Sequence, residues 1–211
     1  MTRPLLAVDH VVYAVTDLDR AGARFLEDVG LGSVAGGRHA GWGTANRIVP
    51  LGDAYLELIT VEDETVASRS PFGASVLRAV SDGDGWLTWA VRDDRLDATA
   101  ARLGLTIGAG ERTRPDGGIL RWRNAGVDDP TRSAELPFFI AWEGPEAMHP
   151  GHMPVEHPSH ADGIAWIELR GDPTAFDRWT DGADLPVRFA DGPEGLHAVV
   201  LRIPDGDRIL R

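Results

Sequence analysis

The chain has 211 residues, 43% of them hydrophobic, which is enough material for one sizeable core or two small ones. It contains no cysteine, so disulfides, thiolate metal ligands and cysteine nucleophiles are excluded. The formal net charge of −12 argues against a nucleic-acid partner, because binding phosphate requires a basic surface.

The same composition argues against a membrane protein. No apolar run is long enough to span a bilayer, and the opening residues 1–6 lack the apolar segment of a secretion signal. We therefore expect a cytoplasmic protein without a membrane partner. The abundance of Ala, Gly, Arg and Asp is typical of a GC-rich bacterial genome.

An apolar strand opens the chain at Leu6–Val15. Side chains alternate along a strand, so His10 shares its face with small apolar neighbours. Asp17 is suited to cap a following helix that ends near Gly30. The first unit then continues with a glycine-rich loop and two strands, at Gly36–Gly43, Thr44–Leu51 and Ala54–Val61.

The stretch Trp86–Asp93 repeats the pattern of His10–Asp17, and each stretch precedes a helical stripe and further strands. The second unit ends in the apolar run Leu136–Trp142, which plays the part of Ala54–Ile59. A short internal repeat of this kind indicates duplication, with each copy completing the core of the other.

A third and shorter unit resembles the opening strand at Asp162–Leu169. Asp172 and Pro173 fit the cap and first turn of a helix, and two strands follow. We therefore divide one compact fold into a first βαβββ module at 1–62, a second at 83–145, a connecting loop at 146–161 and a third, partial βαββ unit at 162–211.

Glu57 is the residue that most needs an explanation. It lies between Leu56 and Leu58, and a carboxylate is costly to bury unless another group pairs with it. His10, on the apolar face of the first strand, is the natural candidate for that partner.

The pattern resembles the vicinal oxygen chelate superfamily, and more narrowly its glyoxalase-like domain proteins. The resemblance covers roughly residues 5–160. It implies an α+β fold of tandem βαβββ modules whose curved sheets enclose a cavity, beside the third truncated βαββ unit. It is carried by the segments Asp9–Tyr13, Gly36–His39, Gly43–Asn46, Leu51–Ile59 and Leu136–Trp142, which lead into His149-Pro150.

Members of that superfamily commonly bind a divalent metal through the first and last strands of each module. The resemblance places the first module's ligands at His10 and Glu57. It places the second module's ligands at Trp86 and Ala141, which cannot bind a metal. An imidazole and a carboxylate suit Zn, Fe(II), Mn or Ni, and His149 is the candidate for an additional ligand.

Two alternatives to a metal site remain open for this pair. His10 and Glu57 could hydrogen-bond each other inside a metal-free cavity with no chemistry. They could also catalyse without metal, because a carboxylate in an apolar cavity can move a proton next to a carbonyl, with His10 as partner or general acid.

The loop Gly36–Gly43 does not lead from a strand into a helix and lacks a Lys-Ser/Thr ending, so it does not predict a phosphate site. We interpret it as a cavity rim at which His39, Trp42 and Asn46 face a ligand. A plain strand connection is the alternative. Trp86 could form a stacking wall for a flat substrate.

Arg121 and Arg123 share one face of a predicted strand in a chain that is otherwise acidic. If that face lines the cavity, the two guanidiniums could bind a carboxylate or a phosphate. A solvated sheet exterior is the alternative reading of the same alternation.

These residues favour a metal-assisted or acid–base enzyme of lyase, isomerase or dioxygenase type, acting on a small oxygenated molecule, with Glu57 and His10 as catalytic residues. The alternative function is a non-catalytic protein that binds or sequesters a small molecule after losing its metal. A subunit without a ligand is a third alternative, and the sequence leaves a homodimer open.

Overall fold

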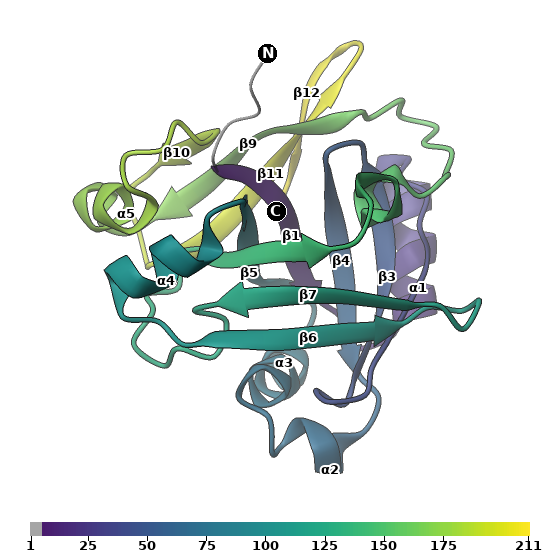
Figure 1. Ribbon diagram of the computed structural model, residues 1–211. Coiled ribbons are helices and arrows are strands. Elements are labelled where there is room, and N and C mark those ends of the chain that lie inside the picture. The colour runs from purple at the N-terminus through teal and green to yellow at the C-terminus, as the bar shows by residue number, and fades with distance from the viewer. Residues whose placement is uncertain (1–5) are drawn as a thin grey trace.

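The computed structural model describes residues 6–211. Within them, eight strands close into a barrel, in the spatial order β1-β4-β3-β2-β6-β7-β8-β5 (Figure 1). The barrel strands are β1 (Leu6–Ala14), β2 (Val34–His39), β3 (Thr44–Leu51), β4 (Ala54–Val61), β5 (Gly85–Asp93), β6 (Ile107–Thr113), β7 (Ile119–Ala125) and β8 (Phe138–Glu143).

Each half of the barrel is one strand–helix–strand–strand–strand unit, so the tandem βαβββ architecture around an enclosed interior is confirmed. Five α-helices and three short 3-10 or π segments complete the described chain. They are α1 (Leu18–Arg24), η1 (Phe25–Val29), α2 (Glu64–Ala67), α3 (Pro71–Asp82), α4 (Leu96–Leu103), η2 (Glu146–Met148), η3 (Pro150–His152) and α5 (Pro173–Thr180).

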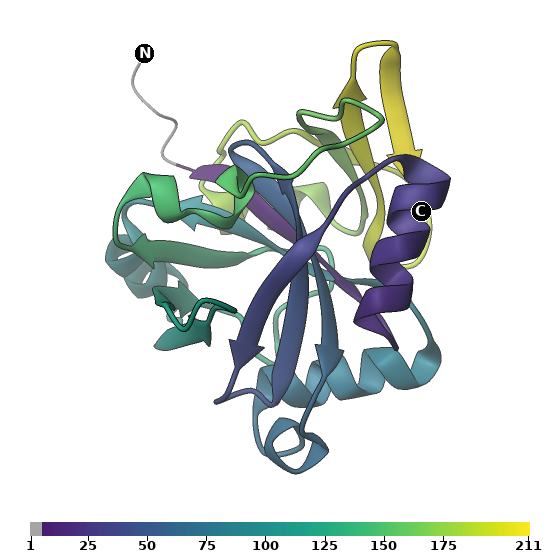
Figure 2. The same ribbon diagram turned by 90° about the vertical axis from the view of Figure 1, so that its right-hand side faces the viewer.

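The helix starts follow the capping chemistry of the sequence. The Asp17 side chain accepts from the backbone N–H of Arg20, and Asp172 accepts from that of Thr174, as predicted. Both α2 and α3 lie at the lower end of the barrel in the two views, and Figure 2 shows α3 running beneath it. Among residues 6–211, no helix is long and apolar enough to cross a membrane.

The two modules are related by a local two-fold axis. In the antiparallel pairing of β1 with β5, His10 lies opposite Ala90 and Val12 lies opposite Thr88. The register shifts on either side of these pairs skip Asp9 in β1 and Leu87 in β5, so exchanging the two strands superposes the two bulges and places Thr88 where His10 stands. The repeat predicted from sequence is out of register by two residues, because it put Trp86 at that position.

The last strands of the two modules obey the same relationship. Val12 pairs with Glu57 in β4, and Ala90 pairs with Phe138 in β8. Phe138, rather than Ala141, therefore corresponds to Glu57. The second module offers a hydroxyl and a phenyl ring at the two places where the first offers an imidazole and a carboxylate.

The third unit forms a separate four-stranded sheet at the upper end of the molecule in both views. Its spatial order, β10-β9-β11-β12, differs from that of the barrel modules. A strand at the end of the chain was not predicted, so the unit holds one more strand than expected. The strands are β9 (Gly163–Arg170), β10 (Val187–Phe189), β11 (Gly195–Ile203) and β12 (Gly206–Leu210).

The wall of the barrel separates two apolar clusters. The outer cluster packs the small sheet and α5 against β1, β5 and β8, and Trp89 stacks on Phe176 within it. The inner cluster fills the barrel, and Phe72 and Val76 of α3 close its lower end. Burial of these faces supplies the main driving force for the fold. The polar groups of the candidate site lie at the inner cluster.

Candidate functional site

Two consecutive side chains, Asp9 and His10, both turn into the barrel. Alternation would send them to opposite faces, but the pairing of β1 with β5 shifts its register between Val8 and His10, which marks a β-bulge. Val8 and Val11 on either side belong to the outer cluster. Asp9 is fully buried, and His10 is 3% exposed.

Asp9 accepts hydrogen bonds from three side chains. The donors are His10 Nδ1 at 2.7 Å, Trp142 Nε1 at 2.9 Å and His149 Nε2 at 3.1 Å. Burial by itself raises the pKa of Asp9, but the hydrogen bonds from the two imidazoles outweigh it and hold the pKa well below its usual range. The carboxylate is therefore ionised at neutral pH.

An ionised carboxylate can only accept hydrogen bonds, so the nitrogen that each of the two imidazoles turns toward Asp9 must carry a proton. Nδ1 of His10 carries a proton, so Nε2 keeps a lone pair whenever the ring holds a single proton. His149 donates from Nε2 to Asp9 and accepts the backbone N–H of Gly151 at Nδ1, at 3.1 Å. Both nitrogens of His149 are thus occupied, and it is unavailable as the additional metal ligand considered above.

Glu57 reaches the same interior from β4. Asn46 donates from Nδ2 to Oε1 at 2.5 Å, which orients the carboxyl group. The other close approaches are 3.6 Å from Oε2 to His10 Nε2 and 3.8 Å from Oε1 to His39 Nε2. Both exceed a hydrogen-bond length, so these groups face a shared gap without bonding each other.

Two further rings frame this gap. Burial lowers the pKa of His39 to about 4, against the opposing charge of Glu57, so the imidazole is neutral at pH 7 and forms no ion pair. Tyr55 stacks on His10 with ring centroids 4.6 Å apart. Burial raises the pKa of Tyr55 well above its usual value, so the phenol keeps its proton.

A small hollow lies over these polar groups. It comprises about 350 Å³ of empty space, part of it open to solvent, but only about 20 Å³ is roomy enough for water-sized occupants. Any larger ligand requires the surrounding rings to shift. Its polar lining also includes Arg112, and its walls are the aromatic side chains Trp42, Phe72, Trp122, Phe138 and Trp142.

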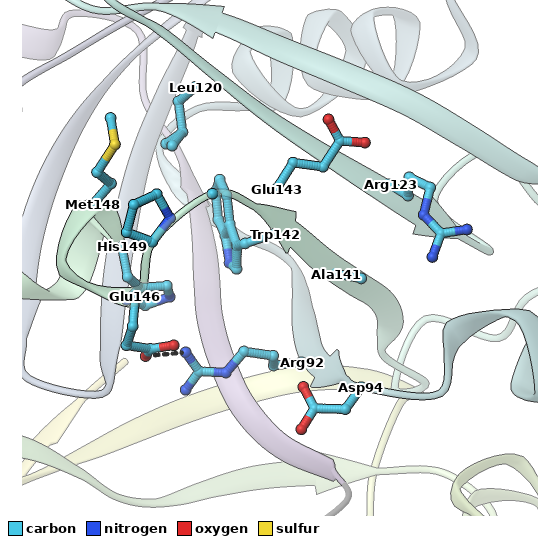
Figure 3. Close-up of a pocket in the computed structure, with 12 residues that line it drawn as sticks. Arg92, Asp94, Leu120, Arg123, Ala141, Trp142, Glu143, Glu146, Met148 and His149 are labelled. Carbon is cyan, nitrogen blue, oxygen red and sulfur yellow. Dashed lines mark hydrogen bonds and ion pairs between the residues drawn. The ribbon is translucent and has the colours of Figure 1, made fainter.

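A larger pocket adjoins the hollow, with about 290 Å³ of room for water-sized occupants against about 20 Å³ in the hollow, and Trp142 lines both (Figure 3). On the pocket side lie His149 and Arg92, whose guanidinium donates to Glu146 at 3.1 Å. The Nε1–H of Trp142 is tied to Asp9, which holds the indole in place as the partition between the two spaces.

The rim residues predicted from sequence are distributed as follows. His39 and Trp42 line the hollow, and Asn46 lies directly behind Glu57. Trp86 does not reach the hollow: it packs edge-on against Tyr13, with centroids 4.7 Å apart, at the outer cluster. The structure therefore places Trp86 outside the hollow, in agreement with the two-residue shift in register, and its role as a stacking wall is not proposed further.

Arg121 and Arg123 point away from the hollow. Their side chains are 54% and 41% exposed, and they pair with Glu111 at 3.3 Å and Asp97 at 2.9 Å. The face of β7 that they share is the barrel exterior, which was the alternative reading. Arg123 only borders the open pocket of Figure 3.

A metal fits this arrangement poorly. His10, His39 and Glu57 have suitable donor types, but no three or more His, Cys, Asp or Glu side chains within residues 6–211 are grouped so that they could hold a metal ion. At the second-module positions, Phe138 has no donor atom, and the Thr88 hydroxyl is 3.2 Å from an Arg132 nitrogen that donates to it.

Sequence reasoning missed three polar members of the site: Asp9, Tyr55 and Arg112. Alternation assigns Asp9 to the wrong face because a bulge leaves no reliable trace in the sequence. Tyr55 could have been found, because it is two residues from Glu57 on the same strand and so shares its face. Arg112 was indistinguishable from the neighbouring surface arginines.

Comparison with known proteins agrees with the fold. Residues 8–184 match the family described as "Glyoxalase-like domain". A hypothetical protein from Staphylococcus aureus is 19% identical with a TM-score of 0.67, over 97% of this chain and 84% of that one. Methylmalonyl-CoA epimerase from Mycobacterium tuberculosis is 21% identical with a TM-score of 0.48, over 69% of this chain and 94% of that one. No curated protein matches the chain.

At 19% identity and a TM-score of 0.67, the Staphylococcus aureus structure shows a common fold and nothing about activity. The family match is stronger evidence than the solved structures, because it is a match to a family model over most of the chain. The matched residues include both candidate catalytic residues. The chain therefore belongs to the glyoxalase-like domain family.

Proposed function

We propose that the protein is an acid–base enzyme of isomerase or lyase type that moves a proton at a carbon next to a carbonyl of a small oxygenated molecule. Glu57 and His10 are the catalytic residues in this proposal. The substrate occupies the hollow between them after the aromatic walls have shifted.

One observation carries the proposal: Glu57 Oε2 and His10 Nε2 face each other at 3.6 Å without a hydrogen bond. A pair built only for stability would be expected to close that gap, because burying a polar atom without a partner costs free energy. The gap leaves two proton acceptors directed at one place in a largely water-excluded site.

The chemistry follows from the two acceptors. One of them takes the proton as the C–H bond breaks, and the bonding electron pair moves into the carbonyl to give an enolate. The group that took the proton then returns it to carbon, or the opposite group returns one if it entered the reaction protonated, and no oxidant is needed. Return from the opposite side inverts the carbon, and departure of a neighbouring group gives elimination.

The neighbours of this pair have positioning roles in the proposal. Asn46 orients the carboxyl group of Glu57 through its 2.5 Å bond. Asp9 holds the Nδ1 proton of His10, and it would stabilise the imidazolium that forms when Nε2 accepts a proton. Neutral His39 and the indole of Trp42 shape the space for the substrate.

Incorporation of deuterium from D2O tests the proposal. Pyruvate, acetoacetate and their amides are incubated with the protein, and loss of the protons next to the carbonyl is followed by NMR. We expect exchange above the buffer rate, reduced at least about 100-fold in Glu57→Gln. Glu111→Gln, at an exposed carboxylate on the outer wall, is the matched control. Tight binding without any exchange would overturn the enzyme proposal in favour of a binding protein.

A further inference from the structure

Arg112 carries a buried charge on the wall of the hollow. It lies on β6, is 2% exposed and lines the hollow beside Glu57. Its Nε has no hydrogen-bond partner. Across residues 6–211, no side chain forms a hydrogen bond or an ion pair with its guanidinium, although the other buried arginine of the barrel, Arg92, is bonded to Glu146.

Such an arrangement is costly for the protein alone. Burial lowers the pKa of Arg112, yet a guanidinium stays protonated in proteins, so the charge cannot be discharged. Glu57 offsets part of the cost through space, but its Oε1 is already taken by Asn46. The guanidinium therefore faces the hollow with unused donors.

The backbone of β2 is shaped around this side chain. A Cβ added at Gly37 would stand 2.9 Å from Arg112 Cγ and would also collide with the carbonyl of Thr113. Gly37 has φ of +143°, a conformation that other residues rarely adopt. Glycine at this position allows the Arg112 stem to lie there, so the backbone accommodates a buried charge that no side chain among residues 6–211 hydrogen-bonds.

We infer that Arg112 is the receptor for a carboxylate on the substrate, so that the substrate class is a short oxo acid. This inference rests on the proposed function, because it assumes that the reacting carbon lies at Glu57 and His10. A planar guanidinium matches a carboxylate through two parallel hydrogen bonds, and a dry site strengthens that pairing.

The rest of the hollow limits the class further. Trp42, Phe72 and Trp122 can pack on apolar carbon but cannot compensate a second charge. The space for water-sized occupants in this hollow is only about 20 Å³. A monoanion with a short carbon chain fits best, with its carboxylate at Arg112 and its carbonyl carbons toward Glu57.

Calorimetric titration tests the inference with pyruvate and acetoacetate against their uncharged amides. We expect the wild-type protein to bind at least one acid about 10- to 100-fold more tightly than the matching amide, as bidentate charged bonds imply. Arg112→Met should remove that preference, and Arg112→Lys should retain only part of it. Arg121→Met, at an exposed ion pair, should bind as the wild type does.

The outcomes separate this inference from the proposed function. Equal affinity of wild-type protein for acids and amides, or no binding of either acid, would overturn the role of Arg112. Deuterium exchange on the amides alone would overturn it while leaving the enzyme proposal standing. Acid binding that depends on Arg112 but comes without exchange would support the receptor and sink the enzyme. If Arg112→Met does not fold, the acid-to-amide ratio in wild type and Arg112→Lys still decides.

Discussion

His149 donates to Asp9 across 3.1 Å, although 140 positions separate the two residues in the chain. The contact closes the short helical segment η2–η3 over the barrel and brings a third donor to the Asp9 carboxylate. The segment that the sequence suggested as a mere connecting loop therefore contributes to the electrostatics of the site.

The first prediction concerns Asp9→Asn. An amide can donate as well as accept, so it no longer forces the His10 proton onto Nδ1. We expect deuterium exchange to fall by about 100-fold or more. Loss of charge-assisted hydrogen bonds should also destabilise the fold by roughly 2–4 kcal/mol. Urea denaturation and the exchange assay measure the two effects separately, and unchanged exchange would contradict the positioning role of Asp9.

The second prediction concerns His39 and pH. The folded-state pKa of about 4 lies below the ordinary value of 6.5, so between these values the unfolded chain binds more protons than the folded one. Stability should therefore rise with pH from about 4 to 6.5, by up to about 3 kcal/mol, and this contribution should be constant above that range.

The His39→Gln variant lacks this titrating group, so comparing it with the wild type isolates the contribution of His39. The difference in unfolding free energy between wild type and variant should grow with pH across that window, while contributions from the other histidines cancel. Denaturant melts at pH 4.5, 5.5 and 7 measure it. A difference that stays constant with pH would show that His39 is not buried in its neutral form.

The third prediction concerns two glycines of one region. Gly37→Ala should destabilise the protein by roughly 2–4 kcal/mol, because its Cβ would meet the Arg112 stem and the backbone of Thr113 at a positive φ. Gly41→Ala is the control, since a Cβ there meets nothing within 4 Å. Equal denaturation midpoints for the two variants would refute the tight fit around Arg112.

The fourth prediction compares two indoles that each donate one hydrogen bond. Trp142 donates to the ionised Asp9, and Trp179 donates to the carbonyl of Pro137 at 2.8 Å. A bond to a charged acceptor is worth about 1.5–3 kcal/mol and a neutral one about 1. Trp142→Phe should therefore lower the free energy of unfolding more than Trp179→Phe. The reverse order in urea melts would argue against an ionised Asp9.

Much of the architecture could be predicted from sequence because period-2 alternation and helix caps are local signals. The opening strand, the capped helix after Asp17 and the strand around Glu57 all lie where these signals placed them. The strand β2 was read as a loop, because Gly36 and Gly37 lower strand propensity. A Cβ at Gly36 would collide with Asn46, and a Cβ at Gly37 would collide with Arg112, so these glycines let the two side chains lie against the backbone of β2.

The site was harder to predict because it depends on long-range relationships. His10 and Glu57 could be singled out, since a polar residue in an apolar strand stands out locally. The register of the second module could not be predicted, because Trp86 and Thr88 both fit a strand pattern. Only the pairing of β5 with β1 shows which of them corresponds to His10. Arg112 and Arg121 also differ only in which side of the barrel they face.

The most direct measurement of the central claim is the protonation of the His10 ring, read from long-range ¹H–¹⁵N correlation spectra recorded at a pH at which the ring holds a single proton. We predict a protonated Nδ1, bonded to Asp9, and an unprotonated Nε2 facing Glu57, with the pattern lost in Asp9→Asn. A proton on Nε2 in the wild-type protein, bonded to Glu57, would contradict the claim, because the pair would then be a closed structural contact with no free acceptor on His10.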